Sequence, residues 1–382
     1  MKTVVHGLIV AGGDGILAGL GVAGDAALTP FAGRYRFIDF ALASLAHAGV
    51  DRLDVAAPGP GTLLRTHLAA AARDATVRRR LPTRIAGSFA GSRPERIVGA
   101  LLGCRALDAP AVTVVLTADH VLQLDVRRLV ATHRRLGADV TLCTVPVAAA
   151  EVGGRIAVDV VRNARVRGAV LAPTGLVSLW TGDVVVSAGA RAMLSALAIR
   201  GDTPVALDAL ARQLTIAATD VDGFWHEPTS LEAYYDAQMN LCTPRPQLDL
   251  YDPSWPVCPV GGPYGPAKVV ADAAGRPGQA LNSLVSGGAV VHGGAVFNTV
   301  LGHGVVVESG AEVEDSVLLD GCRVGRMARV RRAVVGVGAV IGDAGEIGFG
   351  PSPAPPARTL ASGLTIVPPI FDTALAVAAA AR

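Results

Sequence analysis

The chain has 382 residues, of which 51% are hydrophobic and 17% are charged, and its formal net charge is +2 at pH 7. This composition predicts a well-packed protein that is long enough for two domains, and it excludes extensive disorder. The small net charge gives no basis for binding nucleic acid or a membrane surface, and no apolar run reaches membrane-spanning length. We therefore expect small molecules or other proteins as partners.

The five cysteines are widely spaced and form no CxxC pair, which argues against a disulfide framework or a zinc site. This usage fits a reducing compartment, so we expect a cytoplasmic protein. The only lysines among the 34 basic residues are Lys2 and Lys268. A general drift from lysine to arginine preserves positive charge, so a cation is truly lost only where neither residue is present.

The chain begins with an apolar run of strand length at residues 4–10, and a turn containing Gly12, Gly13 and Gly15 follows. Glycines allow backbone N–H groups to approach a ligand closely, as in a phosphate cradle. A plain turn between a strand and a helix needs the same residues, so both interpretations remain open.

Helical and strand patterns alternate through the next part of the chain. Helices are predicted at residues 36–47, 62–72, 93–106 and 126–136, and strands at 52–56, 112–116 and 140–145. This alternation predicts an α/β domain with a mostly parallel sheet covered on both faces. The strand at 112–116 leads to Asp119, a candidate ligand for a metal or a hydroxyl group because ligands bind at the carboxyl ends of such strands. A helix-capping or turn role for Asp119 is the alternative. An antiparallel excursion at 155–170 and a closing helix at 231–241 are also predicted.

The last third of the chain contains an internal repeat of aliphatic residues. The repeat positions are Leu284, Val290 and Val296; Leu301, Val307 and Val313; Leu318, Val324 and Val330; and Val335, Ile341 and Ile347. Each triplet begins 17 residues after the previous one. Spacings of six, six and five residues predict a three-sided coil with stacked inward side chains, the left-handed parallel β-helix of hexapeptide repeats.

These patterns set the expected domain limits. We predict the α/β domain at residues 1–245, a Pro- and Gly-rich linker at 246–280, the β-helix at 281–350 and a Pro/Ala-rich tail at 351–382.

Several stretches carry a family resemblance in chain order. They are FAGRYRFIDF from Phe31, ADH from Ala118, LGADVTLCTVPV from Leu136, WHEPTSLEAYYDAQMNL from Trp225, DLYDPSWPV from Asp249 and LNSLVSGG from Leu281. Together they resemble the glucose-1-phosphate adenylyltransferase family, the ADP-glucose pyrophosphorylases of glycogen synthesis, over residues 4–350. The resemblance implies a Rossmann-like nucleotidyltransferase domain followed by the β-helix. It also implies a reaction of ATP with glucose 1-phosphate that gives ADP-glucose and pyrophosphate with Mg²⁺, and a homo- or hetero-tetramer.

The chain departs from this family in the opening glycine motif. The family form is GGxGTRLxxLT followed by a lysine before a proline. The three glycines are present, but the Thr-Arg pair is replaced by Ile16 and Leu17, and the lysine falls on Ala26 or Ala27. Asp14 adds a negative charge to the same turn.

Further departures lie in the sugar-phosphate and metal motifs. The family's Glu-Lys-Pro becomes Leu171, Ala172 and Pro173, its Gly-Thr-Ala-Asp segment becomes residues 91–94, and its metal-binding aspartate aligns with Glu227. Each hydrogen bond from a cation to phosphate contributes about 1.5 to 3 kcal/mol, so the loss of three cations removes roughly 5 to 9 kcal/mol. Such a loss corresponds to several powers of ten in rate. Nucleotide binding at Gly12, Gly13, Gly15 and Asp119 is therefore expected to be vestigial.

Two sites are still predicted from the remaining charges. Asp119 and Glu227 together could hold Mg²⁺, whose ligands are oxygens. Arginines remain beyond the loop, at Arg34 and Arg36, and in one predicted coil of the β-helix, at Arg326, Arg329, Arg331 and Arg332. Since the resemblance implies sugar-phosphate activators that bind between the domains, we expect an effector or anion site at Arg34, Arg36, Arg331 and Arg332. A solvated corner of the coil is the alternative.

These observations leave three alternative functions for the protein. The first is a catalytically impaired paralogue that assembles with an active adenylyltransferase subunit and regulates it. The second is an active nucleotidyltransferase in which Arg93 and Arg96 replace the lost cations. The third is a β-helix acyltransferase that uses His292 or His303 as a general base.

Overall fold

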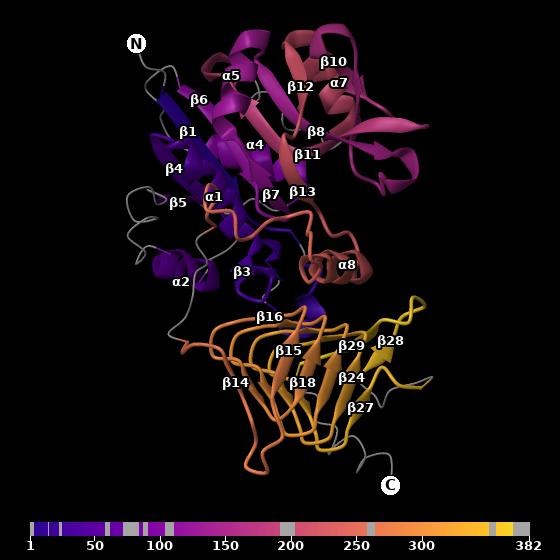
Figure 1. Ribbon diagram of the computed structural model, residues 1–382. Coiled ribbons are helices and arrows are strands. Elements are labelled where there is room, and N and C mark those ends of the chain that lie inside the picture. The colour runs from indigo at the N-terminus through magenta and orange to yellow at the C-terminus, as the bar shows by residue number, and fades with distance from the viewer. Residues whose placement is uncertain are drawn as a thin grey trace. The chain divides into compact units, whose positions relative to one another are not determined.

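The computed structural model describes ten stretches of the chain (Figure 1). These are residues 4–13, 15–22, 25–57, 62–71, 84–86, 91–103, 111–191, 203–257, 264–350 and 357–369. The contacts divide the chain into two compact units. Unit 1 comprises Met1–Gly13, Phe37–Glu227 and Pro253–Cys258, and unit 2 comprises Asp14–Arg36, Pro228–Asp252 and Pro259–Arg382. The segment that follows the glycine turn thus groups with the β-helix, which the chain order alone did not indicate.

Unit 1 is built on a nine-stranded sheet with the order β10-β9-β11-β6-β1-β4-β5, in which β8 pairs with β11 and β12. Its strands are β1 (Val4–Val10), β4 (Arg52–Ala56), β5 (Arg84–Ala86), β6 (Ala111–Thr117), β8 (Val140–Ala148), β9 (Ala157–Val160), β10 (Val166–Ala169), β11 (Leu176–Val186) and β12 (Ile216–Asp220). Strand β1 runs parallel to β4 and β6, whereas β11 runs antiparallel to β6, β8 and β9. The sheet is therefore mixed rather than mostly parallel. Strands β9, β10 and β11 follow one another through short connections, and such connections produce antiparallel neighbours.

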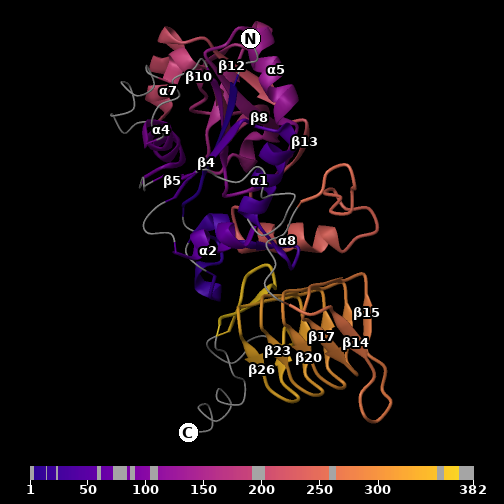
Figure 2. The ribbon, with the colours of Figure 1, turned by 90° about the vertical axis from the view of Figure 1, so that its left-hand side faces the viewer.

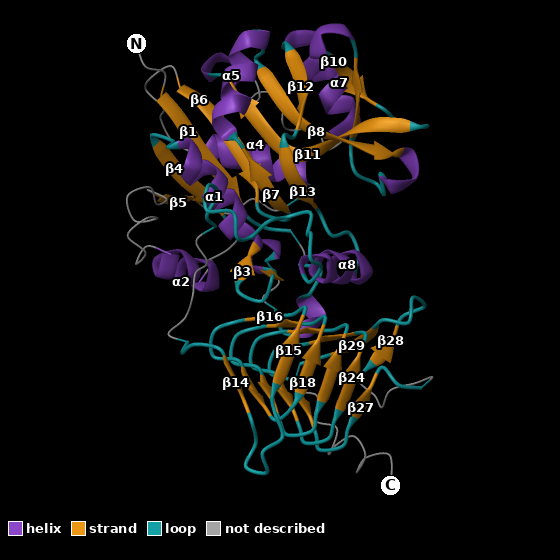
Figure 3. Ribbon diagram, in the orientation of Figure 1, coloured by secondary structure: helices purple, strands orange, loops and turns teal. Residues whose placement is uncertain are grey.

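The helices of unit 1 lie beside this sheet, except the one at residues 62–71, which lies beyond the ends of its strands (Figure 3). They are α1 (Phe37–Ala48), α2 (Thr62–Ala71), α4 (Arg93–Gly103), α5 (Val126–Leu136) and α7 (Thr203–Gln213), with short 3-10 turns at η3 (Ala149–Glu151) and η4 (Arg162–Ala164). The first four confirm predicted helices, and α7 was not predicted. Helix α5 was predictable because its ends have clear sequence signals. The Asp125 carboxylate accepts hydrogen bonds from two N–H groups of its first turn, and Gly137 ends the helix in the left-handed conformation.

A small antiparallel sheet positions the chemistry of unit 1. It consists of β7 (Val121–Leu124) and β13 (Gly223–His226), in which Val121 lies opposite His226. The residues next to this pair, His120 and Glu227, are consequently neighbours although they are far apart in sequence.

Unit 2 contains the predicted parallel β-helix, and Figure 2 shows its short strands stacked coil upon coil. One sheet contains β14 (Lys268–Val270), β17 (Val290–His292), β20 (Val306–Val307), β23 (Arg323–Val324) and β26 (Val340–Ile341). The second contains β15 (Gln279–Leu281), β18 (Ala295–Phe297), β21 (Glu312–Glu314), β24 (Arg329–Arg331) and β27 (Glu346–Ile347). The third contains β16 (Leu284–Val285), β19 (Val300–Leu301), β22 (Val317–Leu318), β25 (Ala333–Val335), β29 (Thr365–Val367) and β28 (Arg358–Thr359). Strands therefore occur in the segments at 246–280 and 351–382, which we had expected to be linker and tail.

The aliphatic repeat fills the interior of the coil, with one correction in its first turn. Val285 and Val291, rather than Leu284 and Val290, pair with the inward residues of the next coil. The first coil is one residue shorter than the others. Because two aliphatic residues stand side by side at each of these places, the repeat pattern could not choose between them.

The rest of unit 2 packs on the outside of the third sheet. It consists of η1 (Ala18–Leu20), η2 (Ala26–Leu28), β2 (Pro30–Phe31), β3 (Tyr35–Arg36) and α8 (Leu231–Leu241), the predicted closing helix. The Tyr234 hydroxyl donates to the Pro30 carbonyl at 2.8 Å, and the Gln238 amide oxygen accepts from the Ala32 N–H at 2.9 Å. Helix α8 thereby holds the loop at residues 30–32 in place. None of the helices in the described stretches is long and apolar enough to cross a membrane.

Candidate functional site

The two predicted metal ligands of unit 1 lie together, and Arg93 joins them. Asp119 follows β6 and Glu227 follows β13. The Arg93 Nε donates to Asp119 Oδ2 at 3.0 Å, while its terminal nitrogens donate to both oxygens of Glu227 and, at 3.3 Å, to the Thr181 carbonyl. The guanidinium thus bridges the carboxylates that we expected to hold Mg²⁺.

Two further arginines reach the same carboxylates. Arg96 Nη2 lies 3.2 Å from Asp119 Oδ2, and Arg155 Nη1 lies 3.4 Å from Glu227 Oε2. The three arginine side chains are between 12% and 18% exposed, so these ion pairs are largely withdrawn from water. Three guanidinium groups face two carboxylates, which leaves a positive surplus at this place.

Local sequence signals place Arg93 at the start of α4. The Ser92 N–H and hydroxyl both donate to the Glu95 carboxylate, at 2.6 and 2.9 Å, and these contacts, the Glu-to-N-cap half of a capping box, hold the first turn. The arginine stem then passes over Gly182, where an added Cβ would lie 2.6 Å from Arg93 Cδ. Gly182 has φ +100° and occupies the register shift in β11, so the irregular strand provides the space for this side chain.

A buried histidine holds Asp119 from the other side. His120 is fully buried, with Nδ1 3.2 Å from Asp119 Oδ1 and Nε2 3.1 Å from Asp183 Oδ2. Asp183 is in turn held by the Thr117 N–H at 3.0 Å and the Thr181 hydroxyl at 2.9 Å. Burial alone would lower the pKa of His120, but Asp183 and Asp119 raise this pKa to about 10. The ring is therefore an imidazolium at neutral pH. Burial alone would raise the pKa of Asp119, and Arg93, His120 and Arg96 instead hold that pKa well below its usual range.

This arrangement does not fit a divalent cation between Asp119 and Glu227. All four carboxylate oxygens contact N–H groups of cationic side chains. Within the described residues, no cluster of three His, Cys, Asp or Glu side chains is suited to a metal. At an effective dielectric near 20, two unit charges about 4 Å apart interact by about 4 kcal/mol, so a divalent ion beside Arg93 would be opposed by about 8 kcal/mol.

The glycine turn after β1 lies against the same cluster. Gly12 and Gly13 have φ of +113° and +99°, and a Cβ on Gly13 would lie 3.2 Å from Arg96 Nη2. Arg96 therefore brings a positive charge to the turn that lacks the family's own arginine. Asp14 lies outside the described residues.

The two substituted positions of the opening motif are buried within unit 2. Leu17 is 0% exposed and packs in one apolar cluster with Leu20, Tyr234 and Val300. The lysine position falls on Ala26 or Ala27, which are 6% and 0% exposed. These positions contribute to packing in this protein.

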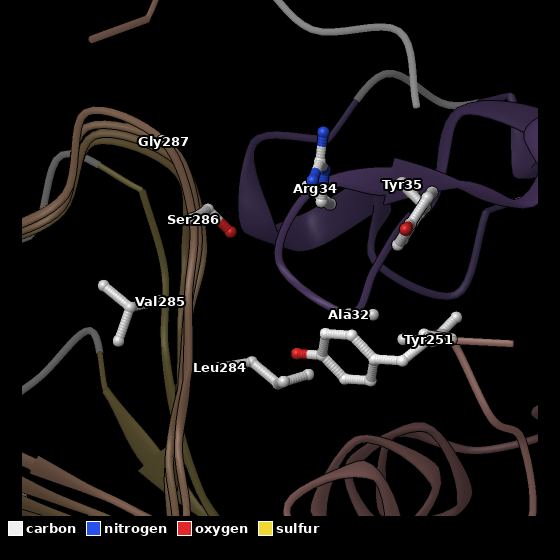
Figure 4. Close-up of a pocket in the computed structure, with 9 residues that line it drawn as sticks. Ala32, Arg34, Tyr35, Tyr251, Leu284, Val285, Ser286 and Gly287 are labelled. Carbon is white, nitrogen blue, oxygen red and sulfur yellow. The ribbon is translucent and has the colours of Figure 1, made fainter. Parts of the chain in front are cut away.

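Arg34 lines a pocket in unit 2 of about 140 Å³ (Figure 4). The lining residues are Ala32, Arg34, Tyr35, Leu250, Tyr251, Leu284, Val285, Ser286 and Gly287. In Figure 4 the Ser286 hydroxyl points from the coil toward the loop that carries Arg34. Arg34 itself is exposed, and its guanidinium lies 5.7 Å from the centre of the Tyr35 ring. The pocket offers a cation and a hydroxyl to a small anion.

The other predicted effector arginines are engaged elsewhere in unit 2. Arg36 pairs with Asp320 at 2.6 Å, Arg331 lies 3.9 Å from Glu314, and Arg332 lies over the Tyr235 ring and donates to the Ser362 carbonyl. Arg329 pairs with Glu312 and Glu346. For Arg326 the contacts given within the described stretches are made by the backbone: its N–H donates to Asp343 and its carbonyl accepts from the Ala344 N–H. The structure thus assigns Arg34 to a pocket and gives Arg36, Arg331 and Arg332 protein partners of their own.

The two candidate histidines of the β-helix differ in environment. His303 is 8% exposed, stacks on Tyr264 with ring centres 4.2 Å apart and donates to the Gly287 carbonyl. His292 is 42% exposed and lies 3.8 Å from Glu308. These contacts hold His303 in place and indicate a structural role rather than that of a general base.

Comparison with known proteins agrees with this architecture. Residues 6–170 match the model of the nucleotidyl transferase family, and residues 265–366 match that of the GlmU-like C-terminal hexapeptide domain. The chain is thus a nucleotidyltransferase-type protein with a hexapeptide β-helix.

Curated relatives narrow the assignment. A glucose-1-phosphate adenylyltransferase of Parafrankia sp. is 31% identical over 381 residues, covering 90% of this chain and 92% of the relative. Those of Frankia casuarinae and Thiobacillus denitrificans are also 31% identical, covering 87% and 90% of this chain and 89% and 85% of the relatives. The chain belongs to the glucose-1-phosphate adenylyltransferase family, whose members act on ATP and glucose 1-phosphate and typically use Mg²⁺.

Sequence reasoning identified Asp119, Glu227, Arg93 and Arg96 but missed the rest of the cluster. Asp183 carried a usable signal, because a lone aspartate inside the apolar strand segment WTGDVVV must have a buried partner. No local pattern points to Arg155, which reaches Glu227 only through the folding of the sheet.

Proposed function

We propose that this protein is a catalytically impaired member of the ADP-glucose pyrophosphorylase family that assembles with an active subunit and regulates it. The observation that carries the proposal is the burial of Leu17. In the family's opening motif this position is an arginine, and here it is a fully buried residue of an apolar cluster. The phosphate-binding part of the loop has therefore become part of the packing of unit 2.

The second substituted position supports the same conclusion. Ala26 and Ala27, one of which stands at the lysine position, are both buried, and neither short side chain supplies a cation. Catalysis of nucleotidyl transfer depends on positioning and on stabilising phosphate charge, and a buried leucine and alanine supply neither. We therefore expect very low formation of ADP-glucose by the protein alone.

The pocket at Arg34 supports the regulatory part of the proposal. Among the contacts of the described residues, Arg34 has no carboxylate partner, while Ser286 offers a hydroxyl from the opposite wall. A small carboxylate or phosphate matches this pair of donors. The regulatory chain would then contribute its own effector site to a homo- or hetero-tetramer.

Co-expression with a catalytic adenylyltransferase subunit tests the proposal. We expect the two chains to co-purify and the effector concentration for half-maximal activation to differ from that of the catalytic subunit alone. Arg34→Ala should keep assembly and remove this difference. Arg323→Ala is the matched control, because Arg323 is exposed and pairs only with Glu308 in the described part of unit 2. Failure to assemble under all effector conditions would contradict the regulatory role.

One observation favours an active enzyme as the second candidate. Arg96 lies against Gly13, so it stands beside the turn that has lost its family arginine. If Arg96 replaces that cation, the purified protein forms ADP-glucose and Arg96→Ala abolishes the activity. An unchanged rate in Arg96→Ala removes this version.

A further inference from the structure

The carboxylates of Asp119 and Glu227 are neutralised by the protein itself. We infer that the Arg93 guanidinium takes the place of a divalent cation, so that this site binds neither Mg²⁺ nor Mn²⁺ and receives a phosphate-bearing ligand through arginines alone. This inference goes beyond the proposed regulatory function, since it concerns ligand binding and holds whether or not the chain assembles with an active subunit.

The saturation of the carboxylates is the first support. Arg93 and Arg96 contact Asp119 Oδ2, and His120 contacts Asp119 Oδ1 at 3.2 Å. Arg93 contacts both oxygens of Glu227, and Arg155 contacts Oε2. Oxygen ligands for a hard cation would have to be released from all of these partners.

The position of Arg93 is prepared by its surroundings. The hydrogen bonds from Ser92 to the Glu95 carboxylate hold the first turn of α4, and Gly182 leaves room for the arginine stem. The Thr181 carbonyl accepts a further hydrogen bond at 3.3 Å. The protein therefore holds the Arg93 guanidinium in a fixed position between Asp119 and Glu227.

Charge and hydrogen-bonding capacity indicate the class of ligand. Among the described residues, three arginines face two carboxylates, so the described cluster retains positive charge after these ion pairs are made. Two buried donors, Arg96 Nε and Trp225 Nε1, have no acceptor among the described residues. The Trp225 ring lies 5.9 Å from the Arg155 guanidinium, within the same cluster. Anionic oxygens satisfy both the surplus charge and such donors, and nucleotides, sugar phosphates and inorganic phosphate all supply them.

Metal binding by the full chain is the direct test. Titration with Mn²⁺ alone, followed by electron paramagnetic resonance, should show no bound ion up to about 1 mM, which excludes a site with a dissociation constant well below that concentration. Arg93→Met removes the guanidinium and keeps an unbranched apolar side chain in place of the arginine stem, so we expect Mn²⁺ affinity to rise at least about tenfold. Arg128→Met is the matched control, because Arg128 pairs with Asp222 at the surface. Tight Mn²⁺ binding by the unmodified protein that Asp119→Asn abolishes would overturn the inference.

Ligand titrations decide the point even if Arg93→Met does not fold. Calorimetry with ATP, glucose 1-phosphate and inorganic phosphate should show binding of at least one of them, with affinities in EDTA and in Mg²⁺ that agree within about threefold. The three ligands distinguish a nucleotide, a sugar phosphate and free phosphate as the source of the anion. A loss of affinity of about tenfold or more in EDTA would overturn metal independence, and no binding of any ligand at about 10 mM would overturn the ligand class.

Discussion

Leu17 offers a sharp test of whether the opening loop has become a structural element. The side chain is fully buried in an apolar cluster with Leu20, Tyr234 and Val300. Truncation of a buried leucine to alanine removes about 2 to 5 kcal/mol of folding free energy, depending on how far the site collapses. We therefore expect Leu17→Ala to lower stability by about 3 kcal/mol.

Leu17→Arg restores the residue of the family motif and should be worse for the fold. Its guanidinium would enter a site lined by aliphatic and aromatic side chains, and burial of an unpaired charge costs several kcal/mol. The variant should lose at least as much stability as Leu17→Ala and gain no measurable ADP-glucose formation.

Urea unfolding followed by far-ultraviolet circular dichroism measures both effects. For a slope of about 3 kcal/mol per M, a loss of about 3 kcal/mol shifts the midpoint by about 1 M. Leu63→Ala is the control, because Leu63 is 63% exposed and should change stability by no more than about 0.5 kcal/mol. A Leu17→Arg protein that is as stable as the parent and forms ADP-glucose would refute the reasoning.

Two further predictions concern each unit separately. Gly33 has φ +73°, and an added Cβ would lie 2.3 Å from Ser286 Oγ and 2.8 Å from the Leu301 carbonyl oxygen, so Gly33→Ala should destabilise unit 2 by about 1 to 3 kcal/mol. Thermal unfolding checks this against Gly19→Ala, where an added Cβ meets nothing within 4 Å, and equal melting temperatures would be the contrary result. In unit 1, burial alone would raise the pKa of Asp54, but His6 and Arg52, each 3.0 Å from Asp54 Oδ2, lower this pKa below the ordinary aspartate value of 3.8. The ionised form therefore stabilises the fold above pH 3.8, and this contribution is lost as the pH falls through the lower folded value. The stability difference between the parent and Asp54→Asn should be constant near neutral pH and shrink in acid, and a difference that grows in acid would show the wrong sign.

Much of the fold follows from local patterns. Helix α5 has its cap at Asp125 and its stop at Gly137, and both are legible in the sequence. The aliphatic repeat predicts the β-helix because aliphatic side chains stack from coil to coil in its interior. The same rule fails in the first coil, where adjacent aliphatic residues make the register ambiguous. Strand β11 was missed because its apolar run is interrupted at residues 181–183, where the strand is irregular.

The candidate site was predictable only in part. Asp119 follows from its place at the end of β6, and Glu227 was found through the family resemblance. The bridge made by Arg93 forms because α4 and the ends of β6 and β13 lie close together in the fold. These elements are far apart in the sequence, so no local pattern indicates the contact. The association of Leu17 with the outer face of the β-helix is likewise a tertiary event. For this reason the sequence alone could show the loss of a cation but not the packing role that replaced it.

We expect that this chain does not catalyse Mg²⁺-dependent formation of ADP-glucose. The most direct measurement is pyrophosphate release by the purified protein from ATP and glucose 1-phosphate across a range of Mg²⁺ concentrations, beside a catalytic family member. The loss of about 5 kcal/mol of phosphate stabilisation predicts a rate at least about 10³-fold lower. We expect this residual rate not to depend on Mg²⁺. Turnover within about tenfold of the catalytic member that rises with Mg²⁺ would contradict the account.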